Sequence, residues 1–160
     1  MKYVCPLLAV SDMGLSRKFH EEVLNQRVKV DFGENVTYEG DYALHLQSHY
    51  TNLIENKPIA FGGHDGEIYF EDDDLEALQA RLQAADVEFL HTIREEPWKQ
   101  RVLRFYDPDK HIIEVGETLE LLSYRLNKSG MNAAEIAAAT GIPEEHVVNM
   151  INKYIAEHKV

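Results

Sequence analysis

The chain has 160 residues, of which 44% are hydrophobic and 28% are charged, and its formal net charge is −12. These values are ordinary for a globular protein with one domain, or one domain and an appendage. An acidic surface repels phosphate backbones and anionic lipids, so nucleic acid and membrane partners are disfavoured. A single cysteine, Cys5, excludes an internal disulfide. With no signal-peptide pattern and no apolar run near the ~20 residues that span a bilayer, we expect a cytoplasmic protein.

The first 48 residues predict a strand, a helix and three further strands. Ser11 and Asp12 offer helix caps, and Leu15, Phe19 and Val23 follow at helical spacing. The later segments alternate between apolar and polar residues. We expect strands at 3–10, 26–32, 35–39 and 42–48, and a helix at 14–24. The residues expected to point inward on the second and third strands are Val28, Val30, Phe32, Val36 and Tyr38.

Residues 49–65 show no sustained period, and we interpret them as a long connector of the kind that often forms a functional or mobile loop. The earlier order then starts again. Residues 66–70 predict a strand, the aspartates 72–74 a negatively charged cap, 75–85 a helix and 87–92 a strand. Both halves therefore contain one β-α-β-β-β module, offset by roughly sixty residues, and this repeat predicts an α+β fold.

A β-hairpin ends the second module. Residues 102–106 and 111–115 are β-branched and aromatic, and the sequence Asp-Pro-Asp-Lys at 107–110 is typical of a turn. Alternation places Glu114 on the face opposite Ile113 and Val115. A carboxylate inside an apolar strand needs a partner, because its burial is otherwise costly.

The hairpin sequence Arg-Phe-Tyr-Asp-Pro-Asp-Lys-His-Ile-Ile-Glu-Val (104–115) resembles the closing hairpin of the vicinal oxygen chelate superfamily. This superfamily includes glyoxalase I, bleomycin-resistance proteins and extradiol dioxygenases. The resemblance covers residues 1–118 and implies two βαβββ modules that form a cupped mixed sheet. Beyond it, the sequence pattern itself becomes helical and predicts a helical tail at 119–160. It also implies a possible homodimer. This chain has Lys110 where the family usually has glycine.

The resemblance implies a metal site as well. The four ligand places of the metal-dependent members correspond to Cys5, His45, Glu67 and Glu114, a set that suits Zn, Ni, Mn or Fe. Glu67 and Glu114 would also be catalytic, since a ligand carboxylate can shuttle a proton. The usual first ligand is histidine rather than cysteine. In the alternative, Cys5 is a small buried hydrophobic residue and His45 is a hydrogen-bonded histidine of the pocket. The two glutamates then pair with Arg101 or Arg104.

Residues around the hairpin are candidates for substrate contacts. Arg101 and Arg104 could clamp a carboxylate or phosphate, and Trp98 offers a flat wall with one donor. Alternatively, the arginines offset nearby acids and Trp98 closes the end of the sheet. The full set of predicted substrate-binding residues is Tyr69, Trp98, Gln100, Arg101 and Arg104.

The tail predicts helices at 119–127, 133–140 and 143–158, with a small core of Ile136, Ile142, Val147, Met150 and Ile151. Its last two helices resemble a helix-turn-helix. The tail carries four basic and five acidic residues, however, and its last helix opens with Glu144 and Glu145, which disfavours DNA binding. We expect it to dock on its own cup or on a second subunit.

Two functions follow from the resemblance. The first is a glyoxalase-like, metal-dependent lyase or isomerase acting on a small oxygen-chelating substrate. Dioxygenase chemistry is less favoured, because the set contains one histidine where that chemistry commonly uses two. The second is a metal-free protein that binds and sequesters a small aromatic or cationic molecule, in the manner of bleomycin-resistance proteins. A transcriptional regulator is a distant third.

Overall fold

The computed structural model describes residues 1–159. It contains two compact units, each assembled from several segments of the chain. The first unit comprises Met1–Glu67, Ala84–Glu88 and Tyr106–Ile112, and the second comprises Ile68–Gln83, Phe89–Phe105 and the chain from Ile113 onward. The predicted boundary near residue 118 stays a prediction. No helix in the described part of the chain combines the length and apolar character of a membrane span.

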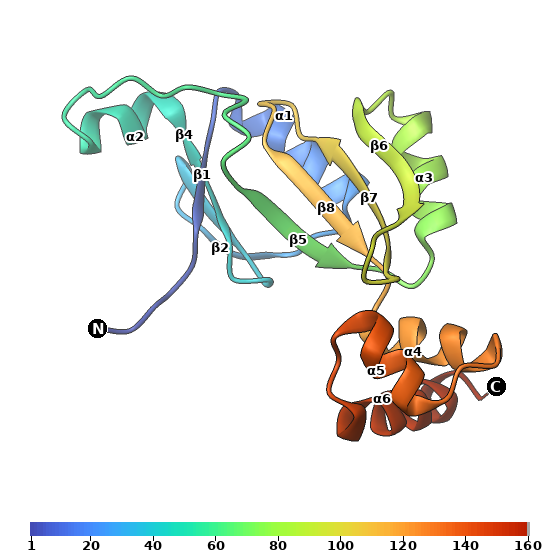
Figure 1. Cartoon of the computed structure of the whole chain (residues 1–160). Coiled ribbons are helices and arrows are strands. Elements are labelled where there is room, and N and C mark those ends of the chain that lie inside the picture. The colour runs from blue at the N-terminus through green and yellow to red at the C-terminus, as the bar shows by residue number, and fades with distance from the viewer. Residues whose placement is uncertain (160) are drawn as a thin grey trace. The chain divides into compact units, whose positions relative to one another are not determined.

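A four-stranded sheet forms the centre of the first unit, in the order β1-β4-β3-β2 (Figure 1). Its strands are β1 Leu7–Val10, β2 Val28–Asp31, β3 Asn35–Tyr38 and β4 Ala43–Leu46. β1 pairs with β4 in parallel, whereas the other pairs are antiparallel. The core contains Val10, Val36, Tyr38 and Leu44, which are fully buried. Val36 and Tyr38 therefore confirm the inward face predicted for the third strand.

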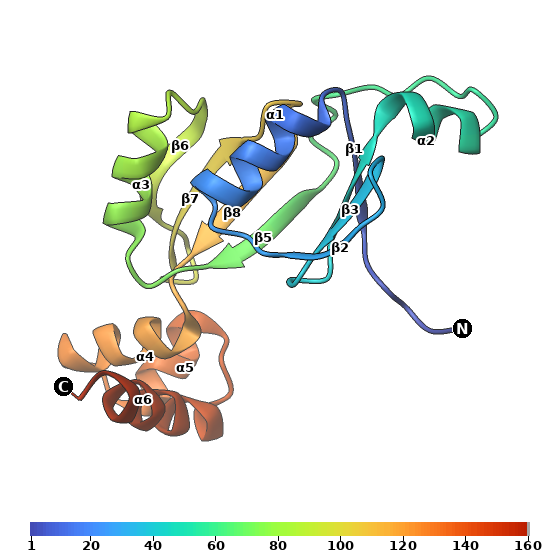
Figure 2. The same ribbon diagram turned by 180° about the vertical axis from the view of Figure 1, so that it is seen from behind.

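The helix predicted at 14–24 has two parts. Helix α1, Met13–Lys18, begins at Asp12, whose side chain accepts a hydrogen bond from the Leu15 amide, and it continues as a π-helix, η1 Phe19–Val23 (Figure 2). The amide of Leu24 bonds to the carbonyl of Phe19, five residues earlier, at 3.1 Å. Such π-turns insert a residue and rotate the following side chains. This local change cannot be seen in an apolar periodicity.

Two predictions for this unit are wrong. Val30 and Phe32 are 39% and 71% exposed, because β2 is an edge strand and the turn that follows it faces solvent. The expected irregular connector begins with helix α2, Gln47–Leu53, which follows β4 directly. The sequence there lacks an apolar face of helical spacing, and no residue of α2 is buried.

The second unit repeats the arrangement, with strand order β5-β8-β7-β6 (Figure 1). Its strands are β5 Glu67–Glu71, β6 Phe89–Glu95, β7 Arg101–Tyr106 and β8 Ile112–Gly116. Helix α3, Leu75–Ala84, is capped by Asp74, whose carboxylate accepts a hydrogen bond from the Ala77 amide at 2.9 Å. Both sheets have the order first, fourth, third, second. The predicted repeat and the α+β fold class are therefore confirmed.

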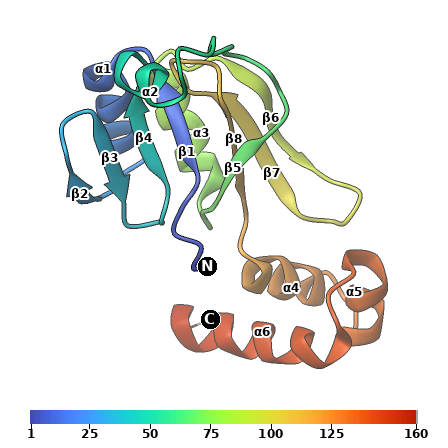
Figure 3. The same cartoon turned by 90° about the vertical axis from the view of Figure 1, so that its left-hand side faces the viewer.

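Three helices complete the second unit: α4 Leu119–Lys128, α5 Ala133–Thr140 and α6 Glu144–His158 (Figure 3). Their own small core confirms the predicted tail core: Leu122, Leu126, Ile136, Ile142 and Val147 are buried, with Met150 and Ile151 packed against them. A capping box between Asn132 and Glu135 begins α5, and Gly141 ends it in the left-handed conformation.

Candidate functional site

An ion-paired network lies on one face of the second sheet. Glu114 on β8 is 5% exposed, and its carboxylate pairs with the guanidinium of Arg104 on β7. The Asp107 amide bonds to the His111 carbonyl across the turn, so counting back along the antiparallel strands places Arg104 opposite Glu114. The partner that Glu114 needs is thus supplied by its own hairpin. Of the two arginines considered from the sequence, it is Arg104.

The network continues to Glu96, which no sequence pattern singles out, because it lies between the strands expected at 87–92 and 102–106. Arg104 Nη1 donates to Glu96 Oε1 at 2.8 Å, and Arg94 Nη2 donates to the same oxygen at 3.0 Å. Burial raises the pKa of the Glu96 carboxyl, but the two guanidiniums outweigh burial and hold the pKa below its usual range. His91 completes the cluster, with Nε2 3.2 Å from Arg104 Nη1. The two arginines and two glutamates balance one another in charge.

Gln100 forms hydrogen bonds with two aromatic side chains, Tyr69 and Trp98. Its Nε2 donates to the Tyr69 hydroxyl at 2.8 Å and to the Glu117 carbonyl at 2.7 Å, while its Oε1 accepts from Trp98 Nε1 at 3.1 Å. Gly116 makes room for this arrangement, since a Cβ there would lie 2.8 Å from Gln100 Nε2 and 2.9 Å from the Tyr69 hydroxyl. Gln100 is 5% exposed. It is therefore suited to positioning the aromatic rings rather than to contacting a ligand itself.

The rings that Gln100 holds are open to solvent. Tyr69 is 46% exposed and Trp98 is 42% exposed. Burial of its hydroxyl raises the pKa of Tyr69 to about 12, so it is a donor at neutral pH. That hydroxyl donates a hydrogen bond to Glu71 Oε1 at 3.0 Å. An exposed indole, an exposed phenol ring and a surface carboxylate thus lie next to the balanced ionic network.

Arg101 forms ion pairs with two glutamates of its own unit. Its Nη1 lies 2.7 Å from Glu76 Oε1, and its Nε lies 3.4 Å from Glu117 Oε2. Burial alone would lower the pKa of this guanidinium, but Glu117 and Glu76 outweigh it and raise the pKa. The side chain is thus engaged with two carboxylates. Its predicted contact with a substrate stays a prediction.

The predicted ligands of the first unit lie apart from one another. On β4, His45 Nδ1 lies 3.2 Å from the Asn35 amide and its Nε2 lies 2.7 Å from His49 Nδ1. Burial, and next the neighbouring His49, lower the pKa of His45. Cys5 precedes β1, and the register partner of His45 on that strand is Ala9, four residues further on. The structure does not bring Cys5 beside His45.

The residues present do not fit a divalent cation as they are arranged. Within residues 1–159 no group of three or more His, Cys, Asp or Glu side chains is placed to hold a metal ion. Glu114 forms an ion pair with the guanidinium of Arg104, and both ring nitrogens of His45 have hydrogen-bonding neighbours. Glu67 is exposed at the start of β5. The set of Cys5, His45, Glu67 and Glu114 as metal ligands stays a prediction.

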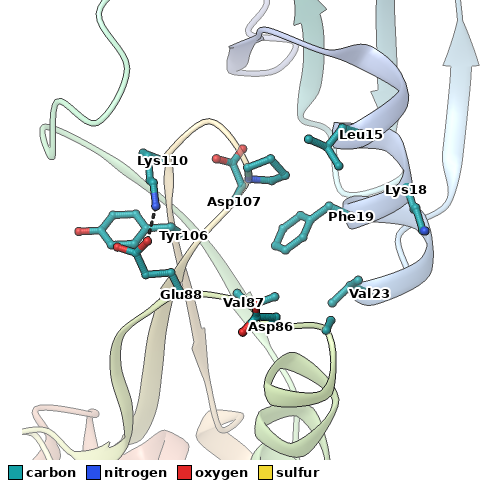
Figure 4. A pocket seen from close by; sticks show the side chains of 12 residues that line it. Leu15, Lys18, Phe19, Val23, Asp86, Val87, Glu88, Tyr106, Asp107 and Lys110 are labelled. Carbon is teal, nitrogen blue, oxygen red and sulfur yellow. Dashed lines mark hydrogen bonds and ion pairs between the residues drawn. The ribbon is translucent and has the colours of Figure 1, made fainter.

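A separate cavity of about 480 Å³ lies in the first unit, between α1 with η1, the 85–88 segment and the hairpin turn (Figure 4). Its apolar wall consists of Leu15, Phe19, Val23, Val87 and Pro108. At its rim Lys110 pairs with Glu88. None of the residues predicted to bind a metal or a substrate lines this cavity.

The match to a known family agrees with this architecture. Residues 3–120 match the glyoxalase-like domain, and the chain belongs to that family. A protein of unknown function from Agrobacterium tumefaciens C58 is 35% identical, with a TM-score of 0.68, over 74% of this chain and 94% of that one.

More distant solved structures share the fold. A glyoxalase-related enzyme from Fulvimarina pelagi is 19% identical, with a TM-score of 0.64, over 74% of this chain and 89% of that one. The fosfomycin resistance protein FosX from Mesorhizobium loti is 19% identical, with a TM-score of 0.54, over 73% of this chain and 92% of that one. Among curated proteins, none matches the chain.

Proposed function

We propose that this chain is a small-molecule binding protein that takes an aromatic cation, such as an aryl amine, on the polar face of the β5-β8-β7-β6 sheet, without a metal. The observation that carries the proposal is the Arg104–Glu114 ion pair. It occupies the carboxylate that metal-dependent relatives use as a ligand. The function is thus that of the binding members of the superfamily, which sequester a compound rather than transform it.

The exposed groups of this face define the ligand chemistry. Trp98 and Tyr69 offer ring surfaces for stacking, and their hydrogen bonds to Gln100 fix the edges of both rings. A cation above such rings is attracted by their negative faces. Glu71, next to the Tyr69 hydroxyl, adds a full negative charge. The arginines of the face are neutralised by Glu96 and Glu114, so they do not offset that attraction.

Calorimetric titration with three matched probes tests the proposal: 2-phenylethylamine, 2-phenylethanol and 3-phenylpropionate carry the same ring with positive, zero and negative charge. We expect the amine to bind about tenfold more tightly than the alcohol, a difference of about 1.4 kcal/mol, and the acid to bind weakest. Glu71→Gln removes the charge while keeping the size and should abolish the preference for the amine. Glu39→Gln, in the first unit, is the matched control. Equal affinity for all three probes, or none, would overturn the proposal.

The metal-dependent alternative is a lyase or isomerase of the glyoxalase type. One observation favours it: His45 Nε2 and His49 Nδ1 lie 2.7 Å apart, and imidazole is a good ligand for Zn, Ni, Mn or Fe. Elemental analysis of the purified protein, beside His45→Ala and Glu114→Gln, distinguishes the two functions. About one metal per chain in the wild type, lost in both variants, would establish the alternative.

A further inference from the structure

A buried carboxylate joins the helical tail to the loop that carries Trp98. Glu117 lies between β8 and α4 and is fully buried. Arg125 on α4 reaches it with Nη2 at 2.7 Å from Oε1 and Nε at 3.2 Å from Oε2. The amide of Arg101 donates to Glu117 Oε1 at 2.8 Å. A buried charge is tolerated only when it is paired and hydrogen-bonded, and Glu117 satisfies both conditions.

The same arginine also bonds directly to the loop. Arg125 Nη2 donates to the carbonyl of Lys99 at 2.7 Å, in the turn between Trp98 and Gln100. The carbonyl of Glu117 in turn accepts from Gln100 Nε2. Gln100 holds the Trp98 indole and the Tyr69 hydroxyl. A continuous series of hydrogen bonds therefore runs from α4, through Glu117 and Gln100, to both exposed rings.

A second contact fixes the start of α4. Thr118 caps the helix, with its Oγ1 3.1 Å from the Leu121 amide, and the same hydroxyl donates to Asp73 Oδ1 at 2.7 Å. Asp73 lies just before α3. Helix α4 is therefore bonded both to the segment before α3, through Thr118, and to the 96–100 loop, through Arg125. The family match ends at residue 120, and Arg125 lies beyond it. The anchoring guanidinium thus belongs to the part of the chain outside the family match.

We infer that Arg125 is a positioning residue for the ligand site: it orders the 96–100 loop through Lys99 and Glu117 and thereby fixes the Trp98 and Tyr69 rings. The tail is then part of the binding site, although it does not contact the ligand. This inference rests on the proposed function for its biological meaning. Its structural content, the order of the loop, does not depend on any ligand.

Trp98 is the only tryptophan of the chain, so its fluorescence reports directly on the loop. In the ligand-free protein we expect Arg125→Ala to raise the acrylamide quenching constant of Trp98 about twofold, because a loop that loses its anchors opens more often. Lys153→Ala is the matched control, since Lys153 also lies in the tail and pairs with an acid, Glu120, without contacting the loop. It should leave the quenching constant unchanged.

Arg125→Lys keeps the charge but cannot bond to Lys99 and to both Glu117 oxygens at once, so it should give an intermediate quenching constant. This variant keeps the test valid where the alanine variant fails to fold. Unchanged quenching in either folded variant, or an equal rise in Lys153→Ala, would overturn the inference. Titration with 2-phenylethylamine follows as a separate arm. Raised quenching with no amine binding in the wild type would support the positioning role and reject the proposed function.

Discussion

The two sheets have the same strand order, but the buried polar groups of the two units have different partners. In the first unit these groups include two imidazoles, since His20 bonds to the Tyr42 hydroxyl and His45 to Asn35 and His49. They also include two carboxylates, Asp107 and Asp109, which accept hydrogen bonds from backbone amides. In the second unit they are carboxylates paired with arginines, as in Glu96, Glu114 and Glu117. One architecture therefore buries imidazoles and amide-bound carboxylates in one unit, and carboxylates paired with arginines in the other. A repeated fold fixes where polar groups can lie, but not their charge.

The largest effect should come from breaking the ionic network. Arg104→Ala leaves Glu114 and Glu96 without their shared guanidinium, and removing one member of a buried pair costs about 3–5 kcal/mol. We expect a loss of this size in the free energy of unfolding, measured by urea denaturation. Lys29→Ala is the control, because its pair with Asp41 is exposed and should contribute little to the free energy of unfolding. Equal losses in the two variants would show that the network is not a special feature of the second unit.

The stability of the first unit should depend on pH through a buried imidazole, His20. Burial lowers the pKa of His20 from 6.5 to about 4, against the smaller opposing effect of Asp107. The unfolded chain therefore takes up a proton near pH 6.5, whereas the folded chain resists protonation until about pH 4. Above pH 6.5 His20 is neutral in both the folded and the unfolded chain and does not lower the free energy of unfolding. As the pH drops from 6.5 to about 4, the free energy of unfolding falls by about 3 kcal/mol.

This pH dependence can be isolated by substitution. His20→Phe keeps an aromatic ring beside Phe19 and Tyr38 but cannot take up a proton. Its free energy of unfolding should fall less steeply between pH 6.5 and pH 4 than that of the wild type. His146→Gln, at an exposed site, is the control and should keep the wild-type slope. The same slope in all three proteins would contradict the assigned role of His20.

A smaller effect is expected where the second unit is tightly packed. Gly116→Ala brings a methyl group to within 2.8 Å of Gln100 Nε2, and such overpacking costs about 1–3 kcal/mol. The variant should also shift the fluorescence maximum of Trp98, since Gln100 must move. Gly66→Ala is the control, because nothing lies within 4 Å of a Cβ there. An unshifted spectrum in Gly116→Ala would show that Gln100 does not hold the indole.

The smallest effect concerns a polar group at the surface of the tail. Asn132 caps α5 and forms a capping box with Glu135. Asn132→Ala should cost about 1 kcal/mol in thermal or urea unfolding. Asn149→Ala on α6 is the control, since Asn149 caps no helix. A cost for Asn132 as large as that for Arg104 would contradict the view that burial of charge sets the scale of these effects.

The elements that could be predicted from the sequence are those whose signals are local. The hairpin, the aspartate-capped helix α3 and the three tail helices all follow from alternation, helical spacing or caps. The exposure of Val30 and Phe32 could not be predicted, because it depends on which strand lies at the edge of the sheet. The π-turn after Lys18 likewise depends on packing, since helix periodicity is the same on both sides of it.

The site could be predicted only in part, for the same reason. Trp98, Gln100 and Tyr69 were singled out by residue type, but the burial of Gln100 between the two rings is a tertiary feature. The pairing of Arg104 with Glu114 was within reach, because the length of the turn fixes which residues face each other. Glu117 and Arg125 were not singled out at all. Their contact joins the hairpin to a helix, and no spacing in the sequence indicates it.

The most direct test of the central claim is a fluorescence titration of Trp98 with 2-phenylethylamine, carried out with and without a metal chelator. The account predicts a saturable change in fluorescence with the same Kd in both conditions, because Arg104 already occupies Glu114. The absence of saturable binding, or binding that the chelator abolishes and a divalent metal restores, would contradict the account. The second result would support the metal-dependent function, with Glu114 and His45 as metal ligands.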